Sequence, residues 1–306
     1  MENTCLGIEI GGTKLQITAG NSPAKVLERR RFKVDPAAGG AGIREQIKTA
    51  LAEMIPAAKV AAIGVGFGGP VDWKTGRICC SHQIEGWEDF QLRDWLRSLS
   101  GLPVCVENDA NSATLGEALY GAGVGLNPVF YVTLGSGVGG GLVVDGRIYH
   151  GAKPGESEVG HIRLDRTGTI LEQRCSGWAV DARIRKSIQA EPQSLLGQLA
   201  AGSASGEAKW LAAALAKGDV AARRILEETA EDLAFGLSHV VQLFHPDVIV
   251  LGGGLSLVGE PLRAAVEGAL FRFTMEAFAP GPQVRLAKLG EDAVPVGALH
   301  LAKAIA

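Results

Sequence analysis

The sequence has few cysteines, no excess of basic charge and no long apolar run, and each absence removes a class of protein. Five cysteines in 306 residues, without a CxxC pair, favour neither a disulfide framework nor a redox motif. A formal net charge of -3 offers no basic surface, so we expect no nucleic-acid partner. No apolar run approaches the roughly 18 residues of a membrane helix, and the N-terminus does not read as a signal peptide. The sequence therefore predicts a soluble cytoplasmic protein with no membrane partner.

Glycine, by contrast, is abundant, with 42 residues in the chain against an average usage of about 7%. The glycines gather at the ends of apolar runs, where backbone without Cβ atoms can approach a ligand closely. Hydrophobic residues make up 46% and charged residues 21%, which is a globular composition. The length suffices for two domains.

Apolar runs and helical repeats alternate along the chain. The runs read as strands, and the predicted strands lie within 5–12, 60–71, 103–110, 128–144 and 246–254. Apolar residues at helical spacing predict helices at 43–55, 90–100, 112–121, 206–218 and 219–245. This alternation predicts an α/β fold. The small-residue stretches 37–42 and 200–207 are expected to be loops.

Two segments, "LGIEIGGTKLQITAG" at 6–20 and "YVTLGSGVGGGLVVDG" at 131–146, share a strand–turn–strand pattern. Either the chain holds two related halves or the similarity of two short segments is chance. The second segment contains Gly135-x-Gly137-x-x-Gly140, but a strand pattern follows where a dinucleotide fingerprint needs a helix. A Rossmann site is therefore excluded, and no P-loop motif is present. A glycine-rich turn between strands can still bind phosphate through its N–H groups, although a tight hairpin is the simpler alternative for either turn alone.

Polar residues crowd the exit of one predicted strand, in the stretch "VENDANSATLGE" at 106–117. Helix capping accounts for one of the residues Glu107, Asn108, Asp109 and Asn111, but not for four. The pattern favours a site in which an aspartate acts chemically.

Five motifs occur in an order that resembles one family. They are "IEIGGTK" at 8–14, "ENDANSATLGE" at 107–117, "VTLGSGVGGG" at 132–141, "GESEVGH" at 155–161 and "VIVLGGGLS" at 248–256. On these motifs the chain is identified as a member of the ROK family of sugar kinases, within the actin/hexokinase/Hsp70 ATPase superfamily. The resemblance implies a two-lobed actin-like ATPase (ribonuclease H-like) α/β fold with a central cleft. It implies a small lobe of 1–113 plus 290–306, a large lobe of 114–289, and a homodimer formed through the large lobe.

The resemblance also assigns the site. Asp109 is expected to be the general base that removes a proton from a sugar hydroxyl as that oxygen attacks the γ-phosphate of ATP. The expected sugar ligands are Gly69, Gln83, Asn108, Asp109, Glu158 and His161. The expected nucleotide-binding residues are Gly11, Gly12, Thr13, Lys14, Gly135, Ser136, Gly137, Gly139, Gly253 and Gly254. The implied cofactors are ATP and Mg²⁺.

The sequence departs from the family pattern in three places. Glu9 stands where an aspartate is usual, so its contact with Mg²⁺ is expected to shift or to pass through water. The cysteine-rich zinc loop is reduced to Cys175 after His161, which predicts no structural zinc; Asp181 lies near, but no family role is assigned to it. Gln83 stands where an asparagine is usual, with His82 replacing a proline, so the identity of the sugar is open.

Other residues are expected to be ordinary. Glu156 is a competing carboxylate beside Glu158. We expect surface or core roles for His82, His150, His239, His245 and His300, and packing roles for Trp73, Trp87, Trp95, Trp178 and Trp210.

The predicted function is an ATP-dependent hexose kinase with glucose as the default substrate. Another hexose, an N-acetylhexosamine, or polyphosphate as donor are alternatives. A transcriptional regulator would need a helix-turn-helix ahead of the first strand, and that strand begins within a few residues of Met1. A non-catalytic sugar or nucleotide sensor is suggested by Glu9 and the missing zinc loop, whereas the intact Asp109 favours catalysis.

Overall fold

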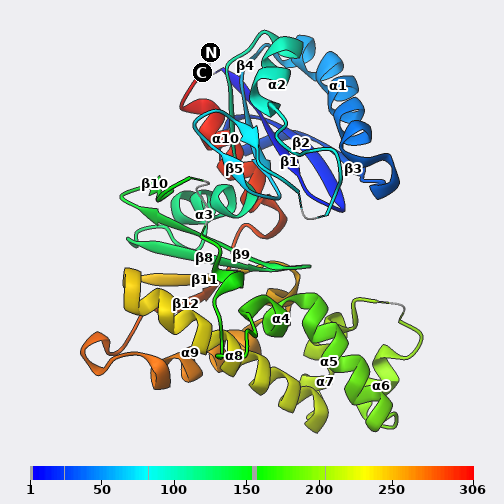
Figure 1. Cartoon of the computed structure of the whole chain (residues 1–306), viewed down its shortest axis with the longest axis vertical. Helices are drawn as coiled ribbons and strands as arrows, with labels where there is room; N and C mark the ends of the chain where they lie inside the picture. The colour runs from blue at the N-terminus through cyan, green and yellow to red at the C-terminus, as the bar shows by residue number, and fades with distance from the viewer. Residues whose placement is uncertain (1–2, 24, 82, 154–156, 204) are drawn as a thin grey trace. The chain divides into compact units, whose positions relative to one another are not determined.

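The protein alternates strands and helices along the chain (Figure 1). The structure, a computed structural model, describes residues 3–23, 25–81, 83–153, 157–203 and 205–306. Contacts between these residues divide the chain into two compact units. Unit 1 is Met1–Gly125, Gly141–Ser157 and Glu291–Ala306, and unit 2 is Leu126–Gly140 and Glu158–Gly290. The lobes expected from the family resemblance, 1–113 plus 290–306 and 114–289, stay a prediction.

The sheet of unit 1 has the strand order β3-β2-β1-β4-β7. Its members are β1 (Thr4–Ile10), β2 (Lys14–Ser22), β3 (Lys25–Lys33), β4 (Val60–Phe67) and β7 (Val104–Asn108). β1 pairs antiparallel with β2 and parallel with β4, which in turn pairs parallel with β7. The register aligns Ile10 with Phe67 and Phe67 with Asn108. The carboxyl ends of three neighbouring parallel strands therefore meet at one edge.

Alternation along β1 sends side chains to opposite faces of this sheet. Leu6, Ile8 and Ile10 are buried in one core with residues of α1 (Gly39–Ala58) and α2 (Leu92–Ser100). Cys5 packs on the other face, against Leu299 of the last helix, α10 (Ala293–Lys303). The short strands β5 (Val71–Asp72) and β6 (Arg77–Ile78) form a separate two-stranded sheet.

Helix α10 lies unusually close to the strands and to α3 (Asp109–Tyr120). A Cβ at Gly64 of β4 would lie 2.9 Å from the carbonyl carbon of Ala298. A Cβ at Gly297 would lie 2.6 Å from the carbonyl carbon of Ser112 in α3. Both positions require glycine because the backbones themselves are in contact. α10 is thus packed tightly between the sheet and α3.

One loop prediction was wrong. Residues 37–42 were expected to be irregular, but η1 (Pro36–Ala38) is followed directly by α1, which begins at Gly39. Packing overrides the poor helix propensity of glycine here: Gly40 N–H donates to Glu85 O at 2.8 Å, and a Cβ at Gly40 would lie 2.9 Å from Gly86 O. The described part of 200–207 is irregular apart from the two end residues, as predicted.

The second sheet has the order β10-β9-β8-β11-β12. Its members are β8 (Val129–Leu134), β9 (Val138–Val144), β10 (Arg147–Ile148), β11 (Val248–Gly252) and β12 (Gln283–Leu286). Numbered in chain order, both sheets read 3-2-1-4-5. Of the two alternatives for the repeated strand–turn–strand pattern, the shared topology favours two related halves over chance.

Helices accompany the second sheet (Figure 1). They are η2 (Val159–His161), α4 (Leu171–Cys175), α5 (Gly177–Ala190), α6 (Leu195–Ala200), η3 (Glu207–Trp210), α7 (Leu211–Ala216), α8 (Val220–Phe244), η4 (Gly254–Val258), α9 (Glu260–Phe273) and η5 (Glu276–Phe278). The short turn η6 (Gly290–Asp292) precedes α10 in the chain. The longest, α8, is capped by Asp219, whose carboxylate accepts from Ala222 N at 2.7 Å, and ends at His245 in the left-handed conformation. Pro246 follows and prevents further helix. Across the described residues, none of the helices has both the length and the apolar character needed to span a membrane.

Candidate active site

The predicted catalytic residue lies where the parallel strands of unit 1 end. Gly11, Gly68 and Asp109 each come directly after the aligned residues of β1, β4 and β7. Gly68 N–H donates to Ile10 O at 2.8 Å. A Cβ at Gly68 would lie 3.3 Å from Asp109 Oδ2 and 3.6 Å from Gly11 Cα. The half-buried carboxylate of Asp109 therefore faces the first glycine-rich loop.

Asn108 performs the capping that the sequence suggested. Its backbone is extended, and its Oδ1 accepts from Asn111 N at 3.0 Å, which closes the first turn of α3. Its Nδ2 donates to Gly69 O at 3.2 Å, so two predicted sugar ligands are in contact. Asp109 Oδ1 accepts from Ala110 N at 2.8 Å, and the positive end of the α3 dipole stabilises the charged carboxylate.

Glu9, the unusual residue of the first loop, has its carboxylate engaged by two neighbours. Lys14 Nζ lies 3.3 Å from Glu9 Oε1, and Gln16 Nε2 donates to Glu9 Oε2. Gln16 is fully buried on β2. The predicted sugar ligand Gln83 packs against this same loop, because a Cβ at Gly12 would lie 2.7 Å from Gln83 Cδ.

Two predicted nucleotide loops lie side by side in unit 2. Gly135 N–H donates to Gly137 O at 2.9 Å, and Gly177 N–H donates to Gly135 O at 2.7 Å, which fixes the second glycine loop on the start of α5. Gly253 has a φ of +78° and a Cβ there would lie 2.5 Å from Leu134 N, so the third loop touches the strand that leads into the second. Glu172 Oε2 accepts from Val138 N at 2.8 Å and holds the end of the second loop.

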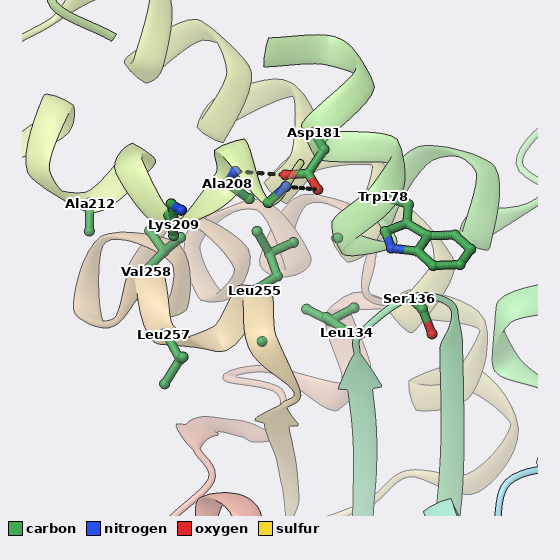
Figure 2. Close-up of a pocket in the computed structure, with 14 residues that line it drawn as sticks. Leu134, Ser136, Trp178, Asp181, Ala208, Lys209, Ala212, Leu255, Leu257 and Val258 are labelled. Carbon is green, nitrogen blue, oxygen red and sulfur yellow. Dashed lines mark hydrogen bonds between the residues drawn. The ribbon is translucent and has the colours of Figure 1, made fainter. Parts of the chain in front are cut away.

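A cavity of about 500 Å³ opens beside these two loops (Figure 2). Its lining residues are Leu134, Gly135, Ser136, Gly177, Trp178, Asp181, Gly206, Ala208, Lys209, Ala212, Gly254, Leu255, Leu257 and Val258. Asp181 accepts from Gly206 N at 3.2 Å and from Ala208 N at 2.7 Å, which fixes the loop at the pocket wall. The lining is therefore mainly apolar, with a carboxylate already satisfied by backbone.

Trp178 corrects one expectation. A packing role was expected for it, yet it is 63% exposed and lines this cavity. Its indole stands at the edge of the pocket in Figure 2. Trp87 packs as predicted, buried against Phe67 and Phe90.

The remaining predicted sugar ligands in unit 2, Glu158 and His161, flank the turn η2. Both are exposed, and His161 N–H donates to Glu158 O at 3.0 Å. Gly160 lies against the backbone of Val138, where a Cβ would be 3.2 Å from its carbonyl carbon. This turn therefore borders the second glycine loop. Glu156 and His82 lie outside the described residues.

Each unit thus gathers one set of predicted site residues. The unit 1 set is Glu9, Gly11, Gly12, Thr13, Lys14, Gly69, Gln83, Asn108 and Asp109, and the unit 2 set is Gly135, Ser136, Gly137, Gly139, Glu158, His161, Gly253 and Gly254. Sequence reasoning missed Gly68, Gln16 and Glu172. Gly68 lies in "GFGGPV" at 66–71, the glycine-rich end of the strand predicted within 60–71, and this glycine cluster was the available signal. The sequence carries no comparable signal for Glu172, whose contact with Val138 spans 34 residues.

The arrangement of His, Cys, Asp and Glu side chains does not by itself indicate a metal site in the described part of the chain. Over the described ranges, no three or more His, Cys, Asp or Glu side chains form a cluster able to hold a metal ion. Cys175 is fully buried, its thiol lies 3.7 Å from Thr229 O, and burial raises its pKa.

Comparison with known proteins agrees with the fold and the motifs. The sequence profile of the ROK family matches residues 5–305. A glucokinase of Halalkalibacterium halodurans is 31% identical over 97% of this chain and 94% of its own length. The structure of a ROK family glucokinase from Streptomyces griseus, in complex with glucose and AMPPNP, superposes with a TM-score of 0.87 at 32% identity and covers 99% of this chain and 100% of that one. A ROK hexokinase from Thermus thermophilus has a TM-score of 0.79 at 30% identity, covering 98% and 97%.

These similarities confirm the predicted actin-like ATPase class of α/β fold. They extend over nearly the whole sequence, as the five motifs do. The chain belongs to the ROK family.

Proposed function

We propose that this protein is a sugar kinase that transfers the γ-phosphoryl group of ATP to a hydroxyl of a hexose, with glucose as the first candidate. The observation that carries the proposal is the position of Asp109, at the start of α3 with its Oδ2 against the first glycine loop. The family and the glucokinase relatives support the same reaction.

Asp109 acts as the general base. Its carboxylate takes the proton from the sugar hydroxyl while that oxygen forms a bond to the γ-phosphorus, and ADP leaves with the electrons of the broken P–O bond. General base catalysis supplies on the order of 10²–10⁴-fold, and the rest comes from positioning and charge stabilisation. Asn108 orients a neighbouring sugar hydroxyl, and its contact with Gly69 O fixes its amide.

The nucleotide binds through the glycine-rich loops and the cavity of unit 2. A volume of about 500 Å³ lies within the range of roughly 300–1,000 Å³ for small-molecule sites. The apolar walls suit a nucleobase, and Trp178 at the edge offers an aromatic face. The loop at Gly135–Gly137 in unit 2 and the loop at Gly11–Gly12 in unit 1 each offer backbone N–H groups of the kind that bind phosphate.

Mg²⁺ suits Glu9 in unit 1, because a carboxylate supplies the hard oxygen ligands that this ion prefers. When bound, the ion neutralises charge on the transferring phosphoryl group. Glu9 would hold it directly or through water. Its present partners, Lys14 and Gln16, would have to yield part of the carboxylate.

That engagement of Glu9 favours one second candidate, a sugar or nucleotide sensor without catalysis. Such a protein would bind ligands through the same residues and release no ADP. Within the kinase class, an N-acetylhexosamine acceptor and a polyphosphate donor stay open. A cytoplasmic homodimer is also part of our proposal, and sedimentation of the purified protein measures the assembly.

The test measures ADP release with Mg-ATP across a panel of hexoses and N-acetylhexosamines, with polyphosphate as a second donor. Wild type is compared with Asp109→Asn and with Asp94→Asn, a matched change on the exposed face of α2. We expect turnover on one sugar, its loss by a factor of about 10²–10⁴ in Asp109→Asn, and no effect of Asp94→Asn. Full activity in Asp109→Asn would refute the assignment of Asp109 as the general base. Ligand binding without turnover on any sugar or donor would favour the sensor.

A further inference from the structure

Glu107, the residue before the Asn108–Asp109 pair, is a buried acid that gathers three donors. Only 4% of it is exposed. Its Oε1 accepts from Asn108 N at 2.9 Å and from Asn111 Nδ2 at 3.1 Å. Its Oε2 accepts from His150 Nε2 at 2.6 Å. The carboxylate therefore binds the backbone of one predicted sugar ligand, the first turn of α3, and an imidazole 43 residues away in sequence.

His150, for which a surface or core role was expected, is held firmly where it meets Glu107. The ring of Trp73 stacks on its imidazole, with centroids 4.0 Å apart and planes 16° from parallel. Three residues later, Lys153 Nζ lies 2.8 Å from Asp72 Oδ2 in β5. The segment that carries His150 is thus fixed to β5 and β7 at both ends, entirely within unit 1.

A buried hydrogen bond contributes little net stability, because folding exchanges bonds to water for bonds within the protein. Such bonds have a greater effect on the orientation of the groups that they join, because each carboxylate oxygen of Glu107 accepts from defined donors. Two of the three donors lie on the elements that meet at Asn108 and Asp109: Asn108 N in β7 and Asn111 Nδ2 in α3. A shift of the Glu107 side chain would release Asn108 N–H and the side chain of Asn111 together.

We propose that Glu107 and His150 form a positioning pair that holds the Asn108–Asp109 segment in its reactive conformation. Neither residue needs to touch the substrate. Glu107 acts through the N–H of Asn108 and the first turn of α3, and His150 acts by fixing the second carboxylate oxygen. The inference rests on the proposed function, in which Asp109 is the base.

The test compares His150→Ala, which removes the donor, with His150→Gln, which restores a side-chain N–H donor. Glu107→Gln, which keeps an acceptor for Asn108 N–H, is the milder change on the other side. The matched control is His300→Ala, which breaks the 2.8 Å contact between His300 Nδ1 and Tyr120 at the far end of α3. For each variant we would measure kcat and KM per folded molecule, Tm, and hydrogen exchange of the Asn108 and Asn111 amides.

We expect kcat of His150→Ala to fall on the order of 10–100-fold, the effect of misplacing a reacting group by about 1 Å. KM for ATP should stay unchanged, and exchange at Asn108 should accelerate. His150→Gln should recover most of the lost kcat, and Glu107→Gln should fall between wild type and His150→Ala. His300→Ala should lower Tm alone.

Two results would overturn the proposal that Glu107 and His150 position the Asn108–Asp109 segment. One is a His150→Ala enzyme with wild-type kcat, whether its exchange changes or not. The other is unchanged exchange at Asn108 and Asn111. If the wild type turns over no sugar, the proposed function fails separately, and the exchange measurement then decides whether the pair holds the segment.

Discussion

Replacing Gly297 with alanine should move α3, the helix that begins with the proposed base, Asp109. The new Cβ would lie 2.6 Å from the carbonyl carbon of Ser112, whereas carbon atoms rest at about 3.5–4.0 Å. The backbones of α10 and α3 must therefore separate by roughly 1 Å. α10 has little freedom to retreat, because its other side rests on Gly64 of β4 and on Gly7 of β1. The displacement falls on α3, which begins with Asp109.

Such overpacking costs about 1–3 kcal/mol of folding free energy. A shift of the base by about 1 Å lowers kcat on the order of 10²-fold. Thermal unfolding followed by circular dichroism measures the first effect, and ADP release per folded molecule measures the second. The control is Gly268→Ala in the exposed part of α9, where a Cβ meets nothing within 4 Å; it should keep kcat and raise Tm slightly, since alanine favours helix. Wild-type Tm and kcat in Gly297→Ala would refute the reasoning.

Three other predictions follow from polar contacts. Burial lowers the pKa of His300, so below the unfolded value of about 6.5 the unfolded chain binds a proton that the folded imidazole does not. Stability should fall as the pH drops from there toward the lower folded pKa, and His300→Gln should flatten the Tm–pH curve in that window; an equal slope in both proteins would contradict this. Asp181→Ala should leave Gly206 N–H and Ala208 N–H without their acceptor, at a cost of about 1–3 kcal/mol each. The KM for ATP should therefore rise roughly tenfold or more, while the KM for hexose stays constant. An unchanged KM for ATP would contradict the proposal that the nucleotide binds in this cavity. Glu9→Gln should raise the Mg²⁺ concentration needed for half-maximal turnover without changing KM for hexose, and an identical Mg²⁺ titration would remove Glu9 from the metal site.

Local patterns predicted the elements that form the frame of each unit. The apolar runs before Gly11, Gly68 and Asp109 are β1, β4 and β7, and the long repeat at 219–245 is α8. These predictions succeed because the apolar periodicity of each segment matches its burial, and because glycines mark the ends of the segments. Strand β3 was missed, since its charged residues Arg29, Arg30 and Arg31 form ion pairs and carry no apolar alternation.

Contacts between distant segments were beyond the reach of sequence patterns. Nothing local links Glu107 to His150, or Asp181 to the backbone of Ala208, because only the folded chain brings those segments together. Trp178 illustrates the same limit, since an indole reads as core by residue type and its exposure depends on the surrounding loops. The family motifs grouped the candidate site residues that each unit brings together, but they did not predict which polar partners hold them.

The packing of α10 also sets an order for folding during synthesis. Unit 1 takes most of its residues from the first 125 but needs Glu291–Ala306 to cover the face that carries Gly7 and Gly64. At a synthesis rate of about 5–20 residues per second, roughly 10–35 s separate the emergence of these two parts. During that interval the first sheet has one uncovered face. Completion of unit 1 therefore depends on α10, the last of the described helices to be synthesised, and until then the uncovered face leaves the nascent chain prone to aggregation.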